Sequence, residues 1–186
     1  MKKGNEQQAV MTGLLIADKS GTFITRHLDW AELQFGGLVG DRHFGVTSKA
    51  DVRQPMYPRG TEIMNRRQIS IVSEEECEEI AAALGIERVA PEWLGANMAL
   101  KGLERLTALP RGTRMLFPSG AGLVCEGDNE PCVHPGKVIA EQMGNPKLAG
   151  KFVKAAWNRR GIVASVERPG IVSAGDEVRI LFPDEL

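Results

Sequence analysis

Residues 36–45 read Gly-Gly-Leu-Val-Gly-Asp-Arg-His-Phe-Gly, and this stretch does most to decide the fold and the candidate site. It places four glycines and three ionisable residues in ten positions, a composition that no core strand would carry. Glycines let the backbone approach a ligand closely, and exposed amides together with Arg42 can hold an anion. Spacing alone leaves two alternatives open: a ligand-binding loop, or a glycine-rich hairpin in which Asp41 and Arg42 pair or cap.

Several familiar catalytic and nucleotide-binding motifs are missing from the chain. Residues 36–45 lack the Lys and Ser or Thr of a P-loop and the G-x-G-x-x-G spacing of a dinucleotide-binding loop. The sequence contains no G-x-S-x-G, the nucleophile elbow of serine hydrolases. A nucleotide-binding enzyme of these types and a hydrolase of this class are therefore set aside.

Length and composition indicate one ordinary globular domain. The chain has 186 residues, of which 42% are hydrophobic and 25% charged, enough to bury a sizeable core. Lys and Arg total 23 against 24 Asp and Glu, so the net charge of −1 gives no electrostatic footprint for nucleic acid or an anionic membrane. Residues 1–10 are polar, unlike a signal peptide, and no apolar run approaches a membrane span. We expect a cytoplasmic protein with neither nucleic acid nor membrane as a partner.

The turn-rich composition favours a mainly β fold. Twenty-one glycines and ten prolines suggest many turns between short strands, and no regular alternation of strands and helices is visible. A β-rich barrel is therefore favoured over a doubly wound sheet. The expected strands are Val10–Ala17, Gln68–Val72, Asn97–Leu100, Arg114–Phe117, Gly122–Glu126, Gly161–Val166 and Glu177–Phe182.

A first helix is predicted to begin after Ser73. Ser73 and Glu76 have the spacing of a capping box, and Gly85 ends the apolar periodicity. Cys77 lies on the apolar stripe of this helix, which predicts a small buried core residue.

A second helix is predicted to begin at Asn145 with Pro146 in its first turn and to stop before Gly161. Its basic residues are expected on the solvated face and at the C-terminal end, where they match the helix dipole. These residues are Lys151, Lys154, Arg159 and Arg160.

The polar loop at residues 126–135 holds the second candidate site. Cys132 is the only cysteine in a loop, and it precedes a helical segment with His134 two residues away. A helix dipole and a protonated imidazole favour the thiolate, so Cys132 is a candidate nucleophile or soft-metal ligand, or else an incidental loop cysteine. A zinc site of Cys125, Cys132 and His134 would lack a fourth ligand, and Cys125 is expected to face the core.

The chain resembles the MOSC domain, which is the C-terminal domain of molybdenum cofactor sulfurases and also occurs as stand-alone bacterial proteins. Residues 37–45 resemble the G-x-x-G-D-R-H-x-G signature of that family, and Pro131-Cys132 stands where the family has its Pro-Cys. Further similar segments follow in the same order: Arg67–Ile71, Leu94–Met98, Leu106–Phe117, Arg160–Val166, Gly170-Ile171 and Gly175–Val178. The resemblance implies that residues 1–12 lead into a single domain over residues 13–186.

The resemblance implies a closed, mostly antiparallel β-barrel of the pyruvate-kinase type with a few peripheral helices. It also implies a role in binding the molybdenum cofactor (molybdopterin with its metal), or in carrying sulfur for it as a persulfide. Cys132 is then the catalytic residue and the metal ligand. The residues expected to contact the pterin and its phosphate are Gly40, Asp41, Arg42, His43, Arg67 and Asn97. One cofactor can touch all of these only if barrel closure brings them to the same rim.

The resemblance leaves the reaction open between sulfur transfer and a molybdenum-dependent reduction of N-hydroxylated compounds. The sulfurases carry a pyridoxal-phosphate desulfurase domain that is not found in these 186 residues, so a partner cysteine desulfurase would supply the sulfur. A reductase would instead need an electron-donor protein. The alternative class is a non-catalytic barrel whose loop at residues 36–45 binds a small anion or a partner protein.

Overall fold

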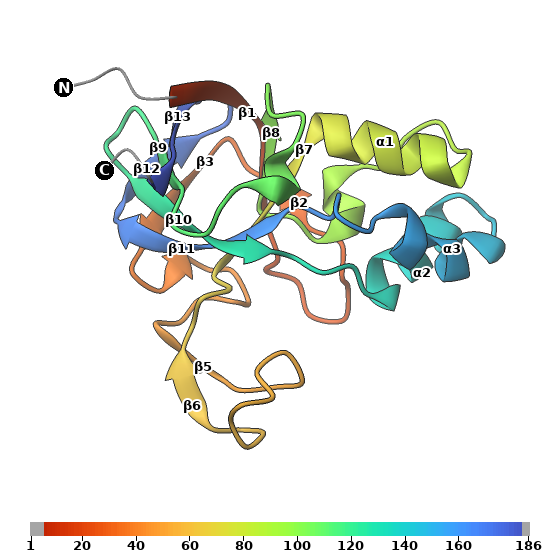
Figure 1. The fold of residues 1–186 in the computed structure, drawn as a ribbon, viewed down its shortest axis with the longest axis horizontal. Coiled ribbons are helices and arrows are strands. Elements are labelled where there is room, and N and C mark those ends of the chain that lie inside the picture. The colour runs from red at the N-terminus through yellow and green to blue at the C-terminus, as the bar shows by residue number, and fades with distance from the viewer. Residues whose placement is uncertain (1–5, 184–186) are drawn as a thin grey trace.

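Seven strands close into a barrel in the computed structural model, which describes residues 6–183 (Figure 1). Their order around the barrel is β13-β9-β10-β11-β7-β8-β1, and β1 pairs back to β13. Every pairing is antiparallel except that between β7 and β8. The prediction of a closed, mostly antiparallel β-barrel is therefore confirmed. The barrel strands are β1 (Glu6–Ile16), β7 (Ile69–Ser73), β8 (Met98–Lys101), β9 (Arg114–Leu116), β10 (Gly122–Asp128), β11 (Ile162–Arg168) and β13 (Glu177–Leu181).

Side chains that alternate along the strands fill the barrel. Ile69 and Ile71 on β7 belong to one apolar cluster with Met98 and Leu100 on β8. The alternate residues of these strands face away from the barrel interior, and two of them, Val72 and Ala99, belong to a second apolar cluster outside the barrel wall. This period of two separates the barrel core from the layer beneath the helices.

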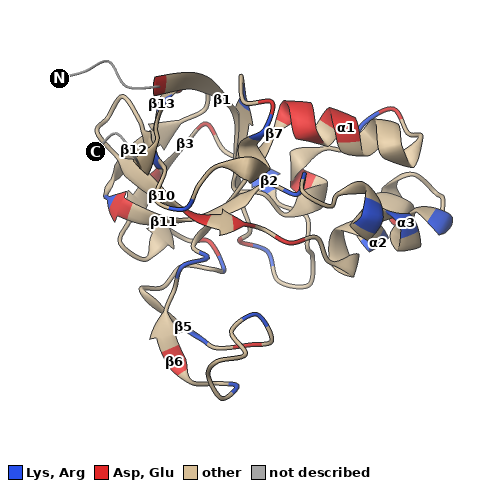
Figure 2. Cartoon of the chain, viewed as in Figure 1, with Lys and Arg blue, Asp and Glu red and all other residues tan. Residues whose placement is uncertain are grey.

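Among residues 6–183, three helices and one 3-10 turn cover that second cluster, α1 (Glu74–Leu84), η1 (Pro91–Leu94), α2 (Val133–Gln142) and α3 (Lys147–Ala155). A second 3-10 turn, η2 (Leu106–Ala108), instead places Leu106 in the barrel core. Cys77, Ile80 and Leu84 of α1 are buried in the second cluster with Phe152 of α3. Acidic residues fill the first turn of α1, where they complement the positive end of its dipole (Figure 2).

Only one of the two hydrogen bonds of the capping box predicted at Ser73 forms. Ser73 Oγ accepts a hydrogen bond from the amide of Glu76, and Gly85 ends α1 in the left-handed conformation. The Glu76 carboxylate does not close the box, because it accepts hydrogen bonds from the amide and the hydroxyl of Thr107. Glu76 therefore ties α1 to the segment that leads into β9.

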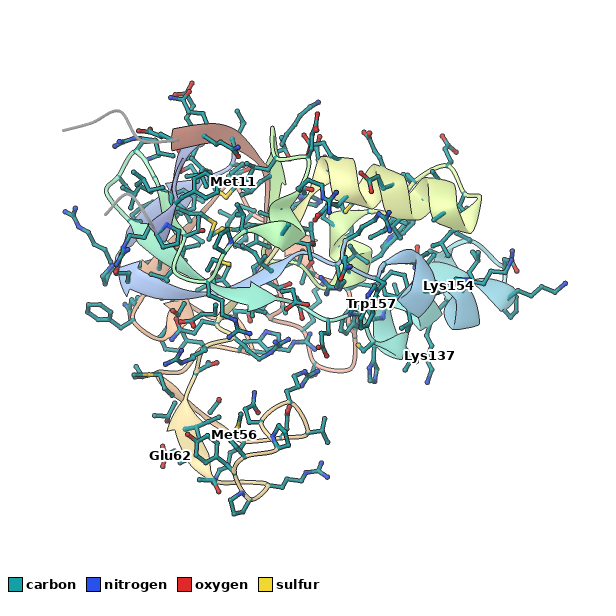
Figure 3. The ribbon with its side chains drawn as sticks, viewed as in Figure 1. Met11, Met56, Glu62, Lys137, Lys154 and Trp157 are labelled. Atoms are coloured by element: carbon teal, nitrogen blue, oxygen red, sulfur yellow. The ribbon has the colours of Figure 1, made fainter. Side chains whose placement is uncertain are left out.

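The second predicted helix is shorter than expected. α3 ends at Ala155, and residues 156–160 form turns before β11. Lys154 extends away from α3 into solvent as predicted (Figure 3). Arg160 was predicted on the solvated end of the helix, and this was wrong, because Arg160 is only 5% exposed.

Within residues 6–183, six further strands lie outside the barrel order or extend its edge. Local sequence patterns predicted none of them, although the family resemblance places Gly170-Ile171 among the closing strands. β2 (Arg26–His27) extends the sheet beyond β1, and β12 (Gly170–Ser173), β3 (Trp30–Gln34) and β4 (Gly37–Leu38) form a small sheet. β5 (Thr47–Lys49) and β6 (Glu62–Met64) form a hairpin that projects from the barrel (Figure 1). We call residues 46–65 the arm.

The first barrel strand begins before the expected domain boundary. Residues 6–12, which we expected to lead into the domain, form the first half of β1, where residues 6–10 pair with β13. Among the helices of residues 6–183, none is long and apolar enough to span a membrane.

Candidate functional site

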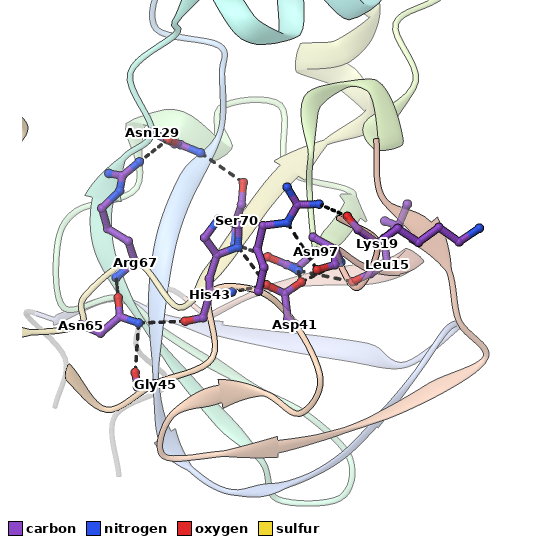
Figure 4. Close-up of polar contacts among 12 residues, drawn as sticks. Leu15, Lys19, Asp41, His43, Gly45, Asn65, Arg67, Ser70, Asn97 and Asn129 are labelled. Atoms are coloured by element: carbon purple, nitrogen blue, oxygen red, sulfur yellow. Dashed lines mark hydrogen bonds and ion pairs between the residues drawn. The ribbon is translucent and has the colours of Figure 1, made fainter. Parts of the chain in front are cut away.

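The Asp41 carboxylate is the centre of a buried polar network at one end of the barrel (Figure 4). One oxygen accepts from the amide of His43 and from its Nδ1, and the other accepts from the amide of Ala17 and from Nδ2 of Asn97, each at 2.8 Å. Burial alone would raise the pKa of Asp41, but the hydrogen bonds from His43 and Ala17 outweigh it and hold the pKa below its ordinary value. Asp41 therefore organises the loop as an ion.

Asn97 completes this network from the start of β8. It is 1% exposed, its Oδ1 accepts from the amide of Ser70, and its Nδ2 also lies 3.4 Å from the carbonyl oxygen of Leu15. Asn97 therefore links β7, β1 and the loop at residues 36–45. The donors and the acceptor of its side-chain amide are therefore all hydrogen-bonded within the protein.

Arg42 and Gly40 shape the loop. The Arg42 guanidinium donates to the carbonyl oxygens of Ala17, Lys19 and Thr22, at distances from 2.7 to 3.4 Å. Gly40 has a φ of 86°, which suits a tight turn without a side chain. Both residues support the loop from outside the pocket described below.

Arg67 belongs to a second chain of hydrogen bonds. Its Nη2 donates to Oδ1 of Asn129 at 2.7 Å, and Nδ2 of Asn129 donates to the Ser70 hydroxyl (Figure 4). The amide of Asn129 donates to the carbonyl oxygen of Gly161. Burial and the charge of Arg53 lower the pKa of Arg67. No sequence pattern pointed to Asn129, since an Asn is common in a polar loop.

Cys132 occupies the N-cap position of α2, and its backbone φ and ψ are those of an extended residue. Its Sγ lies 3.7 Å from Nδ1 of His134, and the His134 ring stacks on Phe23 with a centroid distance of 6.3 Å. Gly95 makes room for Phe23, because a Cβ at Gly95 would lie 2.8 Å from that ring. The sulfur thus lies at the positive end of a ten-residue helix beside an oriented imidazole.

The other two cysteines are buried, as predicted. Cys77 is 4% exposed, and burial raises the pKa of its thiol to about 12. Cys125 is 1% exposed, and burial raises its pKa as well. Cys132 is half-buried, so it is the accessible thiol of the three. Within residues 6–183, no group of three His, Cys, Asp or Glu side chains could hold a metal ion.

A small pocket of about 160 Å³ brings four of the expected site residues together, namely His43, Arg67, Asn97 and Cys132. The other three, Gly40, Asp41 and Arg42, do not line it. Residues that the sequence did not single out complete the wall, among them Arg53 from the arm, Asn129 and Glu130. Arg160 also lines it, although it was expected on the surface.

A larger groove of about 450 Å³ adjoins this pocket and shares Arg53, Arg67 and Val163 with it. The arm forms one wall, where Met56 and Tyr57 lie, and Met56 is visible on the projecting hairpin (Figure 3). The barrel forms the other wall. Four arginines and two carboxylates line the groove, Arg53, Arg66, Arg67 and Arg111 with Glu126 and Asp128.

The chain matches a family model, a curated relative and several solved structures. The model of the MOSC domain matches residues 39–179. A Bacillus subtilis (strain 168) protein, YuaD, whose name describes metal-sulfur cluster biosynthesis, is 55% identical over 169 residues, covering 90% of this chain and 88% of YuaD. The crystal structure of YuaD matches with a TM-score of 0.91 and 53% identity, covering 95% of this chain and 97% of that one.

A more distant structure shares the fold alone. YiiM from Geobacillus stearothermophilus matches with a TM-score of 0.62 at 11% identity, over 93% of this chain and 75% of that one. The arrangement of strands is therefore common to chains with little sequence similarity.

Proposed function

The chain belongs to the MOSC domain family, and from this premise we propose that it carries sulfur on Cys132 for the assembly of a metal cofactor. The observation that carries the proposal is the position of Cys132. It is the accessible one of three cysteines, it caps α2, and it borders a pocket lined by arginines. The name of YuaD, which concerns metal-sulfur cluster biosynthesis, supports the same class of function.

In this proposal Cys132 carries sulfur as a persulfide. A thiolate attacks the outer sulfur of a donor persulfide, a new S–S bond forms, and the donor leaves as a thiolate. In the proposed step the persulfide stands at the N-terminus of α2, where a helix dipole stabilises negative charge. His134, held by Phe23, can accept the thiol proton before the attack.

The donor in this proposal is a pyridoxal-phosphate cysteine desulfurase acting as a separate protein. Cys132 is half-buried, and its neighbours Val133 and His134 are exposed, so a partner's flexible loop can approach the sulfur. Pyridoxal phosphate would stay in the partner, since its Schiff base forms on the partner's lysine.

The acceptor in this proposal is the molybdenum cofactor, and the adjoining groove fits it in part. A volume of about 450 Å³ is in the range of ordinary small-molecule sites, and the groove's arginines suit the phosphate of a pterin. Arg53, Arg67 and Arg111 would hold the phosphate, and Cys132, in the adjoining pocket, would supply the sulfur. When bound, the cofactor supplies a metal to which a sulfur ligand can be added. Asp41, Arg42 and Asn97 would act by positioning, because their polar groups are occupied by protein partners.

A desulfurase reaction tests the proposal. The protein is incubated with a cysteine desulfurase, pyridoxal phosphate and cysteine, and the mass of each cysteine peptide is measured after capping. We expect one added sulfur on Cys132, none in Cys132→Ser, and wild-type loading in the control Cys125→Ala. Sulfur absent from Cys132, or present equally on Cys77, would contradict the proposal.

Reduction of N-hydroxylated compounds is the second candidate, and the groove favours it because a resident cofactor would need such a site. Metal analysis distinguishes the two functions. Protein purified from a host with active cofactor synthesis should contain close to one molybdenum per chain if it is a reductase, and little if it is a carrier. A reductase would also require an electron-donor protein in the assay.

A further inference from the structure

Arg160 is a buried arginine with an unpaired guanidinium nitrogen. The residue is 5% exposed, and its Nη2 donates to the carbonyl oxygen of Leu94. Its Nη1 is buried and has no hydrogen-bond partner among residues 6–183. Burial lowers the pKa of Arg160 to about 10, so the side chain remains charged at neutral pH. A buried charge with an unmade hydrogen bond is unfavourable unless a ligand completes it.

The position of Arg160 is fixed by the residue that follows it. Gly161 has a φ of 92°, and a Cβ there would lie 2.0 Å from the carbonyl oxygen of Ile71. Its amide donates to the Thr107 hydroxyl at 2.8 Å, and its carbonyl accepts from Asn129. The backbone beside Arg160 is thus packed against β7, and the guanidinium is held at the wall of the Cys132 pocket.

The pocket around Arg160 is cationic and small. Arg53, Arg67 and Arg160 line it with one carboxylate, that of Glu130, and Arg53 also pairs with Asp51 on the arm at 2.6 Å. Its volume of about 160 Å³ is below the roughly 300–1,000 Å³ of sites that hold drug-sized ligands. The pocket therefore suits an anion of a few heavy atoms that places oxygens on guanidinium groups and lies within reach of Cys132.

We propose that this pocket binds thiosulfate or a closely related thiosulfonate, and that Cys132 takes the outer sulfur from it. The inference rests on the proposed function of Cys132 as a sulfur carrier and adds a small-molecule donor. The three oxygens of the sulfonate group bind the arginines, and this leaves the outer sulfur directed to Cys132.

The reaction balances without a further reagent. The Cys132 thiolate attacks the outer sulfur of thiosulfate, a bond forms between Sγ and that sulfur, and the S–S bond of thiosulfate breaks. The electron pair of the broken bond leaves on sulfite, and Cys132 becomes a persulfide anion. Negative charge grows on the leaving sulfite, where Arg53 and Arg160 stabilise it in the transition state.

Sulfite release and the mass of the Cys132 peptide measure the reaction. Wild-type protein mixed with thiosulfate should release sulfite and gain one sulfur on Cys132. Arg53→Gln, which changes an exposed side chain on the arm, should lose at least about tenfold in the rate. Arg160→Gln should lose as much or more. Arg159→Gln is the matched control, since Arg159 pairs with Glu79 on the surface and should leave the rate unchanged.

Thiosulfate binding can be measured separately from the sulfur-transfer reaction. This measurement does not depend on whether the Arg160→Gln variant folds. Cys132→Ser should gain thermal stability from thiosulfate over chloride at equal ionic strength, and adding Arg53→Gln should abolish the gain. A wild-type protein that the desulfurase loads but thiosulfate does not would overturn this inference and leave the proposed function intact. Loading by neither donor would overturn both. Thiosulfate loading that is equally fast in Arg53→Gln would overturn the arginine pocket.

Discussion

Nδ2 of Asn97 donates a 2.8 Å hydrogen bond to Oδ2 of Asp41 across 56 residues of sequence. This contact joins the loop at residues 36–45 to the start of β8, and the same Asn97 accepts from the amide of Ser70 on β7. His43, on the other oxygen of Asp41, lines the Cys132 pocket together with Asn97. The loop therefore acts mainly by holding His43 and the barrel end in place.

Removing the Asn97 side chain should destabilise the fold. Asn97→Ala leaves the Ser70 amide and one oxygen of Asp41 short of a partner, and each unmade buried hydrogen bond costs about 1–3 kcal/mol. The free energy of unfolding, measured with urea, should fall by at least about 2 kcal/mol. Gln34→Ala is the control, because Gln34 is exposed and its loss should change stability by less than about 0.5 kcal/mol. Equal effects of the two changes would contradict this role of Asn97.

Acid should weaken the fold through Asp41. The folded pKa of Asp41 lies below its ordinary value of 3.8, so its ionised form stabilises the fold above that pH. This contribution is lost as the pH falls through the folded pKa. Wild-type stability should therefore exceed that of Asp41→Asn at pH 6, and the difference should shrink below pH 3.8.

Glu76 changes the pH dependence of stability in the opposite direction to Asp41, so its effect is measured with a separate variant. Burial raises the pKa of Glu76 above its ordinary value of 4.5, so protonation of Glu76 favours the folded state. Unfolding of Glu76→Gln, measured over the same pH range, separates this effect from that of Asp41. A difference between wild type and Asp41→Asn that does not change with pH would contradict the ionised Asp41.

Two glycines with the same φ should respond differently to alanine. Gly161 and Gly175 have φ of 92° and 93°, but only at Gly161 would a Cβ meet the backbone, 2.0 Å from the carbonyl oxygen of Ile71. Gly175→Ala should cost about 1–2 kcal/mol from the left-handed conformation alone. Gly161→Ala should cost more than about 4 kcal/mol, because β7 and β11 must separate. Thermal unfolding of both variants measures the difference, and similar losses would contradict the close packing at Gly161.

The three cysteines should differ in their rate of alkylation. Burial raises the pKa of Cys77 to about 12, so at pH 8 only about one thiol in ten thousand is ionised, and reagent cannot reach it. Cys125 is also buried with a raised pKa. Cys132 should therefore be modified first in the native protein, and denaturant should make the three rates similar. Timed alkylation with peptide mapping measures this, and equal native rates would contradict an accessible Cys132.

Sequence patterns predicted the parts of the fold that are set by local periodicity. All seven barrel strands were predicted, several of them from alternating or β-branched residues, and Ser73 and Gly85 mark the ends of α1. The arm strands β5 and β6 span three residues each, and their pairing depends on contacts that no local pattern records. The ends of α2 could not be predicted, because its N-terminal part contains Pro135 and Gly136, which are poor helix formers.

A motif or a reactive residue type marked the residues that were expected at the site. His43, Arg67, Asn97 and Cys132 line one pocket, whereas Gly40, Asp41 and Arg42 do not. Arg160 was missed because a helical pattern was extended past Ala155, where the chain turns inward. Arg53 was missed because its place depends on the fold of the arm.

The sulfur state of Cys132 in protein isolated directly from its host shows whether this cysteine carries sulfur. The protein is capped with an alkylating reagent that preserves persulfides, digested, and its cysteine peptides are weighed. We predict a fraction of Cys132 peptides with one extra sulfur between Sγ and the cap, removed by a reductant and absent from the Cys77 and Cys125 peptides. A Cys132 peptide that never carries this sulfur, even when a desulfurase and thiosulfate are supplied, would contradict sulfur transfer by Cys132.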